Sequence, residues 1–145
     1  MSEEEQGRQL YELAVNAKSN LQADRCTIYQ VDRDKWEVVS LFALGLEGQE
    51  SIRLQMSRGL VGAVARSGQS LNLKDAYNDP RFDRKTDQRT GYRTKSLLTV
   101  PIRNGRGQVI GVFQALNAVS GVFSDEDEAR LQVYAQRAAE FLSSS

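Results

Sequence analysis

The 145-residue chain contains no histidine, and this absence removes most of the chemistry that small domains use. Without an imidazole the chain cannot build a Ser-His-Asp or Cys-His catalytic group, a histidine-zinc site, a two-histidine iron site or a histidine-ligated haem. Its single cysteine, Cys26, can form no internal disulfide, which agrees with a reducing compartment. We therefore expect a domain that is not an enzyme.

Net charge and long apolar runs are also lacking. The 19 basic residues balance the 19 acidic ones, so no overall cationic field attracts nucleic acid or anionic lipid. The apolar runs SLLTVPI and QVIGVFQAL are too short to span a bilayer, and the start MSEEEQGRQ is acidic where a signal peptide would be basic and then apolar. These features predict a soluble cytoplasmic protein with no nucleic-acid partner and no membrane insertion.

The length and the hydrophobic pattern predict one α+β domain over residues 1–145. Helical spacing predicts long helices over 3–22 and 123–142 and a short helix between Gly59 and Gly68. Strand patterns occur at 25–32, 36–44, 51–56, 70–73, 96–103 and 108–117. The turn Asn104-Gly105 predicts that the last two strands form a hairpin, and their composition favours the centre of a largely antiparallel sheet.

A polar stretch, residues 72–94 (NLKDAYNDPRFDRKTDQRTGYRT), interrupts these apolar segments. A connection of more than twenty residues in a compact domain is more often functional than idle. We therefore expect it to take part in whatever the domain binds.

Residues 59–117 resemble the core of a GAF domain, through the motifs DPRFD, TGYRTKSLL and GVFQALN together. Within that family they resemble the regulatory cyclic-nucleotide-binding GAF domains of phosphodiesterases and bacterial adenylyl cyclases. The resemblance implies a six-stranded antiparallel sheet with the N- and C-terminal helices on one face. It places a ligand pocket on the other face, under short helices and the long loop, which makes residues 72–94 the lid.

The resemblance also implies the residues that contact a ligand. They are Thr27, Phe42, Leu60, Val61, Asp87, Thr90, Thr94 and Gln114. The amides of Leu60 and Val61 at a helix start suit a phosphate, although the same glycine-led sequence can simply begin a helix. Phe42 offers a surface for a base.

The polar candidates have simpler explanations as well. Asp87, Thr90 and Thr94 have the spacing of one helix face, which suits a purine and is equally typical of a solvated helix. Gln114 lies in a buried strand, with Val112 and Leu116 on its face, and its amide needs either a ligand or a backbone partner.

Two departures from the family pattern bear on the ligand. The structural signature matches at Asn117, Phe123, Asp127 and Glu128, but Ala118 replaces its lysine, so the lysine–aspartate ion pair of the family cannot form and Asp127 loses that partner. Ala43 stands where some guanine-binding relatives have an acidic residue, which favours cAMP over cGMP.

Other GAF activities fit less well. Residues 72–98 contain neither the cysteine nor the histidine with which photoreceptor GAF domains hold a bilin. A free methionine sulfoxide reductase needs more than one cysteine, so Cys26 is better explained as a small buried apolar residue. No bilin and no haem are expected.

Two hypotheses remain open. In the first, the domain senses cAMP or cGMP and relays its occupancy through the terminal helices to a neighbouring output domain. In the second, the pocket is empty or takes another small molecule, and the domain is an interaction module. Under both we expect a homodimer through the terminal helices, where Tyr11, Val15, Val133 and Phe141 lie off the main apolar stripes.

Overall fold

A computed structural model describes residues 2–44, 52–82 and 84–142, except for the side chains of residues 42–44, 86, 89 and 90. Its elements follow the order α1 (Glu3–Asn20), β1 (Ala23–Asp32), β2 (Glu37–Leu44), β3 (Arg53–Gln55), α2 (Gly59–Ser67), β4 (Leu71–Leu73), the 3-10 turn η1 (Ala76–Asn78), α3 (Lys85–Thr90), β5 (Leu97–Arg103), β6 (Val109–Ala118) and α4 (Asp125–Ala138).

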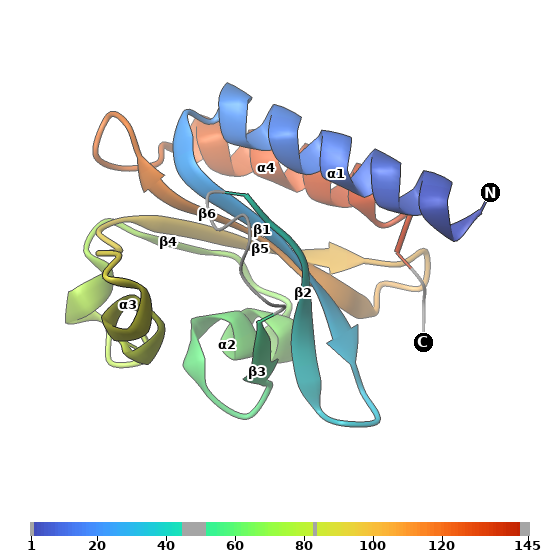
Figure 1. Cartoon of the computed structure of the whole chain (residues 1–145), viewed down its shortest axis with the longest axis horizontal. Helices are drawn as coiled ribbons and strands as arrows, with labels where there is room; N and C mark the ends of the chain where they lie inside the picture. The colour runs from blue at the N-terminus through green and yellow to red at the C-terminus, as the bar shows by residue number, and fades with distance from the viewer. Residues whose placement is uncertain (1, 45–51, 83, 143–145) are drawn as a thin grey trace.

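The strands form one six-stranded antiparallel sheet in the order β3-β2-β1-β6-β5-β4. Helices α1 and α4 cover one face of this sheet, and α2 and the lid lie against the other (Figure 1). The structure therefore confirms the α+β class, the six-stranded sheet and the placement of the terminal helices.

The centre of the sheet differs from the sequence prediction. Strand β1 pairs with both β2 and β6, so β1 and β6 are the two middle strands, and β5 lies one place further out beside β4. Residues 97–102 of β5 are apolar except for Thr99, because layers cover the strand on both faces. An apolar composition therefore indicates that a strand is buried on both faces, and it does not indicate where the strand lies in the sheet.

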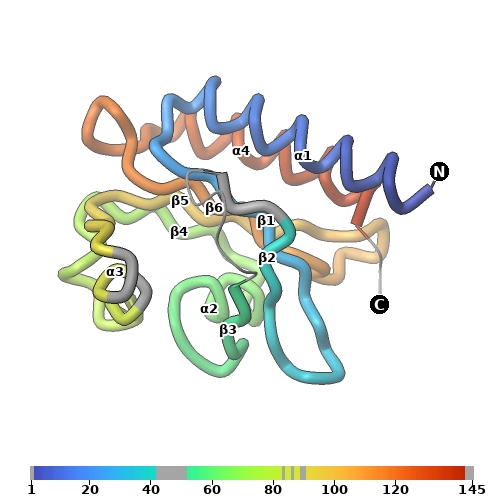
Figure 2. Tube along the Cα trace, in the orientation of Figure 1, coloured from blue at the N-terminus to red at the C-terminus, as the bar shows by residue number. Residues whose placement is uncertain are grey.

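The terminal helices begin with side-chain caps. Ser2 accepts a hydrogen bond from the Glu5 amide at the start of α1, and Ser124 and Asp127 form a capping box at the start of α4. The two helices run antiparallel, so the start of α1 and the end of α4 lie at the same end of the molecule (Figure 2). No helix in the described part of the chain is long and apolar enough to cross a membrane.

Two apolar layers sandwich the sheet. On the helix face, Cys26, Ile28 and Phe113 are packed with α1 and α4. On the other face, α2 is packed over Tyr29 and Val112. Alternate residues of β1 and β6 thus belong to different layers, as the twofold period of a strand requires.

The burial of Cys26 leads to a first prediction. This thiol is fully buried in the helix-face core, and desolvation raises its pKa to about 12 although Lys18 acts in the opposite direction. Because only a thiolate is alkylated, we expect no reaction of the folded protein with iodoacetamide at pH 8 and complete reaction in denaturant, followed by mass spectrometry. Alkylation of the folded protein at the denatured rate would show that the core opens.

Candidate functional site

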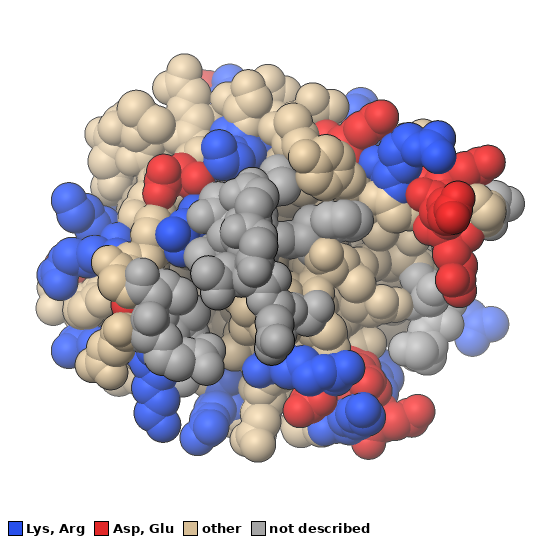
Figure 3. All heavy atoms as spheres, viewed as in Figure 1, with Lys and Arg blue, Asp and Glu red and all other residues tan. Residues whose placement is uncertain are grey.

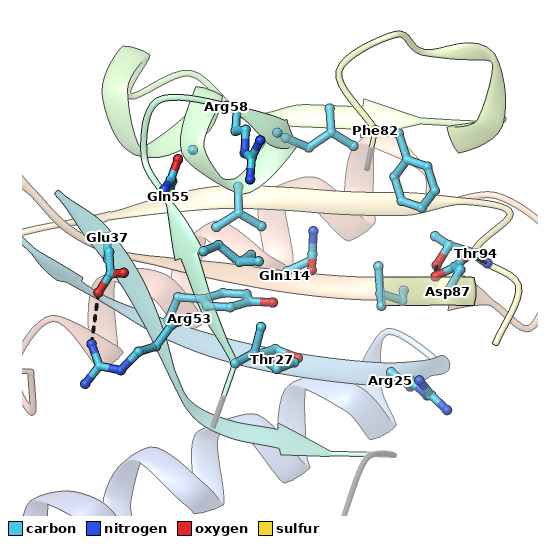
Figure 4. Close-up of a pocket in the computed structure, with 18 of the residues that line it drawn as sticks. Arg25, Thr27, Glu37, Arg53, Gln55, Arg58, Phe82, Asp87, Thr94 and Gln114 are labelled. Carbon is cyan, nitrogen blue, oxygen red and sulfur yellow. Dashed lines mark hydrogen bonds and ion pairs between the residues drawn. The ribbon is translucent and has the colours of Figure 1, made fainter. Parts of the chain in front are cut away.

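A cavity of about 340 Å³ lies between the sheet and the elements on its second face. Its floor comes from β1 and β6, and its other walls come from the start of α2, β3 and the lid (Figure 4). This volume is within the range of small-molecule sites in proteins.

The floor carries three polar side chains in a largely apolar setting. Thr27, Tyr29 and Gln114 are 3%, 4% and 7% exposed, and all three line the cavity. Thr27 of β1 is paired directly with Gln114 of β6. Gln114 Nε2 donates to Thr99 Oγ1 at 3.1 Å.

The remaining polar atoms of this floor have no protein partner. Within the residues that the structure describes, no hydrogen bond is made by Thr27 Oγ1, the Tyr29 hydroxyl or Gln114 Oε1. These atoms are not sealed from solvent, so they are polar groups that the cavity floor leaves open to whatever the cavity holds.

The start of α2 forms a second wall. Gly59 takes φ +80°, which glycine adopts without strain, and the N-cap residue Arg58 makes no side-chain capping bond. The first-turn amides at Leu60 and Val61 therefore have no intrahelical acceptor, and both residues line the cavity. This is the geometry of an anion site.

Three arginines line the cavity, and two of them are engaged. Arg53 pairs with Glu37 at 3.1 Å, and the Arg25 guanidinium lies 3.5 Å from the centre of the Tyr92 ring. Arg58 points from the start of α2 toward the sheet (Figure 4), and it has no partner among the described residues. Arg58 is thus available to an anion held by the α2 amides.

The lid closes the opposite end and is held by its own hydrogen bonds. Asp87 is 6% exposed, and its carboxylate accepts from the Thr94 amide at 2.7 Å, from Thr94 Oγ1 at 2.9 Å and from the Tyr77 hydroxyl at 2.8 Å. Thr94 does not share a helix face with Asp87, because α3 ends before Gly91. Gly91 at φ +74° reverses the chain and brings Thr94 back onto the carboxylate.

The predicted contacts Thr90 and Phe42 have side chains outside the described part of the structure, and so does Ala43. Their backbones are described. Phe42 is paired with Ile28 and Ala43 with Thr27, and Thr90 is the last residue of α3.

Basic side chains surround the lid although the chain has no net charge. Residues 72–94 contain six lysines and arginines against four aspartates. Figure 3 shows Lys and Arg gathered at the edge of the molecule where Figure 1 places α3. Arg84 and Arg93 lie 4.8 and 4.4 Å from the centre of the Tyr77 ring, so part of this charge is fixed over the lid.

The GAF family model matches residues 7–142 of this chain. The chain belongs to the GAF domain family. The match confirms the family that the motifs of residues 59–117 indicate, and a GAF domain is a regulatory module.

The curated relatives are large proteins. The probable 3',5'-cyclic phosphodiesterase pde-5 of Caenorhabditis elegans is 38% identical over 130 residues, which are 82% of this chain and 18% of that protein. The dual 3',5'-cyclic-AMP and -GMP phosphodiesterase 11A of Takifugu rubripes is 37% identical over 136 residues, which are 86% of this chain and 15% of that protein. This GAF domain therefore spans less than a fifth of either relative.

A solved structure shows the same fold. The GAF domain of a phosphoenolpyruvate-protein phosphotransferase from Coxiella burnetii superposes with a TM-score of 0.77 at 24% identity, covering 97% of this chain and 92% of that one. At this identity the likeness establishes the fold of the GAF domain alone.

The signature residues of this GAF domain hold the lid and the last helix. Asn117 Oδ1 accepts from the amides of Lys95 and Ser96, and its Nδ2 donates to the Arg93 carbonyl and to the Tyr92 hydroxyl. Tyr92 also donates to Asp24 at 2.6 Å. The end of the lid is thereby fixed to the ends of β6 and β1.

The loss of the signature lysine does not leave Asp127 without a partner. Asp127 accepts from the Ser124 amide at 2.9 Å, and it pairs with Arg130 one turn later at 3.2 Å. Phe123 is 1% exposed in the helix-face core, and Glu128 is half-buried in the first turn of α4. The cavity forms with Ala118 in place.

Sequence reasoning missed Arg25, Tyr29 and Arg58. Two of them had a signal in the sequence. Arg58 directly precedes the helix-starting Gly59, and Tyr29 follows Thr27 by two residues and so faces the same side of the strand. Arg25 reaches the cavity next to Tyr92, a contact between β1 and the lid that no local pattern indicates. In the described part of the GAF domain no cluster of acidic or cysteine side chains could hold a metal ion.

The lid network leads to a second prediction. Replacing Asp87 by Ala leaves the buried Thr94 amide and the Tyr77 hydroxyl without their acceptor, which costs about 1–3 kcal/mol. We expect the ligand-free melting temperature to fall by several degrees, measured by calorimetry. Asp75→Ala, at an exposed lid carboxylate bonded to Asn78, is the control and should change little. An unchanged melting temperature in Asp87→Ala would contradict a structural role.

Proposed function

We propose that this GAF domain is the regulatory sensor of a signalling protein and binds a cyclic nucleotide in the cavity. The observation that carries the proposal is the set of cavity-floor polar atoms that bond to no described residue, opposite an α2 start without a side-chain cap and beside Arg58. The similarity to the two cyclic-nucleotide phosphodiesterases supports the same ligand class. In this proposal the domain acts without catalysis.

The α2 start supports the placement of the phosphate. A cyclic phosphodiester carries one negative charge, which the amides of Leu60 and Val61 and the guanidinium of Arg58 would share. The base would then lie toward the lid, over Thr27 and Gln114. Phe42 and Thr90 are proposed as further contacts from the family resemblance alone.

The role of Asp87 and Thr94 in this proposal is limited by their mutual hydrogen bonds. Their polar atoms hold the lid together, so they would shape the end of the cavity around the base. We propose that they act on the ligand mainly through this positioning.

Gln114 supports cAMP over cGMP. With Nε2 donating to Thr99 Oγ1, as in this structure, Oε1 of Gln114 would accept from the cavity side. Adenine presents an amino donor at the position where guanine presents a carbonyl acceptor, so this oxygen suits adenine. Ala43 supports the same preference, since it carries no carboxylate to accept from the amino and ring N–H groups of guanine.

Strand β6 supports a relay from the cavity to the terminal helices. Gln114 faces the cavity, and its neighbours Phe113 and Ala115 are fully buried in the core formed with α1 and α4. A shift of β6 on ligand binding would therefore be felt by both helices. We propose that residues 1–145 form one such domain of a cytoplasmic protein, whose output domain would respond to these helices.

Ligand-induced stabilisation tests the proposal. A ligand that binds only the folded state at a hundred times its dissociation constant adds about 2.7 kcal/mol, or several degrees of melting temperature. We expect such a shift with 1 mM cAMP, a smaller shift with cGMP, and a reduced cAMP shift in Arg58→Ala. Arg106→Ala, at an exposed arginine in the β5–β6 turn, should behave like the unchanged protein.

No shift with either nucleotide would contradict the sensor proposal. The interaction module, or a site for another small molecule, would then be the better explanation. If cAMP raises the melting temperature of Arg58→Ala as much as that of the unchanged protein, Arg58 does not contact the ligand, and the rest of the proposal is unaffected.

The outer faces of the terminal helices support a homodimer, with or without a ligand. Tyr11, Val15 and Val133 are 47%, 39% and 48% exposed, whereas Phe141 packs against the helix-face core and is left out of the proposed interface. Val119 is 77% exposed and lines the same surface groove as Tyr11 and Val15. Apolar groups clustered in this way favour a protein contact.

Light scattering tests the dimer. We expect twice the monomer mass at micromolar concentration, and the monomer mass for Val15→Glu, because a carboxylate would be buried without a partner. Trp36→Ser, which removes an exposed aromatic in the β1–β2 turn, should remain a dimer. A monomer at every concentration in the unchanged protein would contradict the interface.

A further inference from the structure

The cavity floor contains the hydroxyl of Tyr29. Neither the sequence motifs nor the start of α2 explains why this group is there. The residue is 4% exposed, and its ring belongs to the apolar cluster with Met56, Val61 and Val64. Within the described residues its oxygen makes no hydrogen bond. Among the described side chains, Asn72 Oδ1 is the one buried polar atom without a hydrogen-bond partner. The unpaired Tyr29 oxygen is therefore accessible to solvent, and it opens on the cavity that Tyr29 lines.

Packing alone does not explain a tyrosine at this position. A phenylalanine would fill the same apolar cluster, so the hydroxyl adds nothing to the packing and instead presents a polar group to the cavity. The hydroxyl is also a constant donor, because burial raises the pKa of Tyr29 and keeps the group protonated. The hydroxyl can therefore donate a hydrogen bond to an acceptor held in the cavity.

The neighbours of Tyr29 show which part of a ligand it meets. Tyr29 follows Thr27 on the cavity side of β1, and the strand runs from the lid end of the cavity toward the β1–β2 turn. Its ring shares a cluster with Val61, from the first turn of α2, and with Met56, just before that helix. The shared cluster puts Tyr29 on the α2 side of the cavity, and from this we infer that its hydroxyl faces the start of that helix.

We propose that the Tyr29 hydroxyl donates a hydrogen bond to a non-bridging oxygen of the ligand's phosphodiester, held at the first turn of α2. This inference rests on the proposed function and adds a neutral donor from the sheet to the charged and backbone donors of the helix start. The anion is then contacted from both walls of the cavity. No bond is formed or broken in this step.

The test compares Tyr29→Phe with the unchanged protein by calorimetric titration of cAMP. A hydrogen bond to a charged acceptor predicts binding that is about ten to a hundred times weaker in the variant. The ligand-free melting temperature should stay the same or rise, because the variant loses an unpaired hydroxyl and keeps the ring. Tyr134→Phe, which removes a hydroxyl bonded to Asn20 on the helix face, is the control and should bind cAMP unchanged.

The two phosphorothioate diastereomers of cAMP identify the contacted atom. Each replaces one non-bridging oxygen by sulfur, a weaker acceptor. For the diastereomer with sulfur at the contacted position, we expect the unchanged protein and Tyr29→Phe to bind alike. For the other, the full difference seen with cAMP should persist.

Three results would overturn the inference, and they can be told apart. Equal cAMP affinity in Tyr29→Phe and the unchanged protein would remove Tyr29 from the site and leave the proposed function standing. An equal loss for cAMP and both diastereomers would place the hydroxyl on another part of the ligand. No binding of cAMP or cGMP by the unchanged protein would overturn both the inference and the proposed function.

Discussion

The pairing of β1 with β6 is the contact on which the rest of this structure depends. It joins residues 23–32 to residues 109–118, the first strand of the chain to the last, and makes them the middle of the sheet. Every other element is added at the sides or on the faces of this pair. The same pairing places Thr27 opposite Gln114, so the cavity floor exists only once the two ends of the fold have met. Such long-range contacts form at a high cost in chain entropy.

Because side chains alternate along the central strands, the two faces of the sheet carry different side chains. Side chains that alternate along β6 belong either to the cavity or to the layer under α1 and α4, so Gln114 and Phe113 are neighbours in sequence and lie on opposite sides. The helix side is packed with apolar groups and is closed. The cavity side keeps polar atoms without protein partners. Strand β6 thus belongs both to the packed helix face and to the candidate site.

The sequence predicts the elements of this domain well and its site only in part. Helices and strands follow from local patterns, such as Ser124 before an acidic first turn, whereas the lid follows from the resemblance to the GAF family. The order of the strands does not, because the β1–β6 pairing has no local signal. The role of Asp87 is missed for a similar reason, since the reversal at Gly91 brings Thr94 to its carboxylate from outside α3. The spacing of residues predicts contacts within one helix, but it does not predict contacts with residues that lie beyond a turn at the end of that helix.

The polar groups of the lid bond mainly to one another, whereas polar groups on the other walls of the cavity stay open. Asp87 and Asn117 hydrogen-bond within the lid and to the residues that join it to the sheet. The groups that remain open lie on the floor and at the start of α2. Among the described residues that line the cavity, Arg53 is held by Glu37 and Arg25 stacks on Tyr92. Arg58 lies at the start of α2, where the helix dipole favours a negative charge.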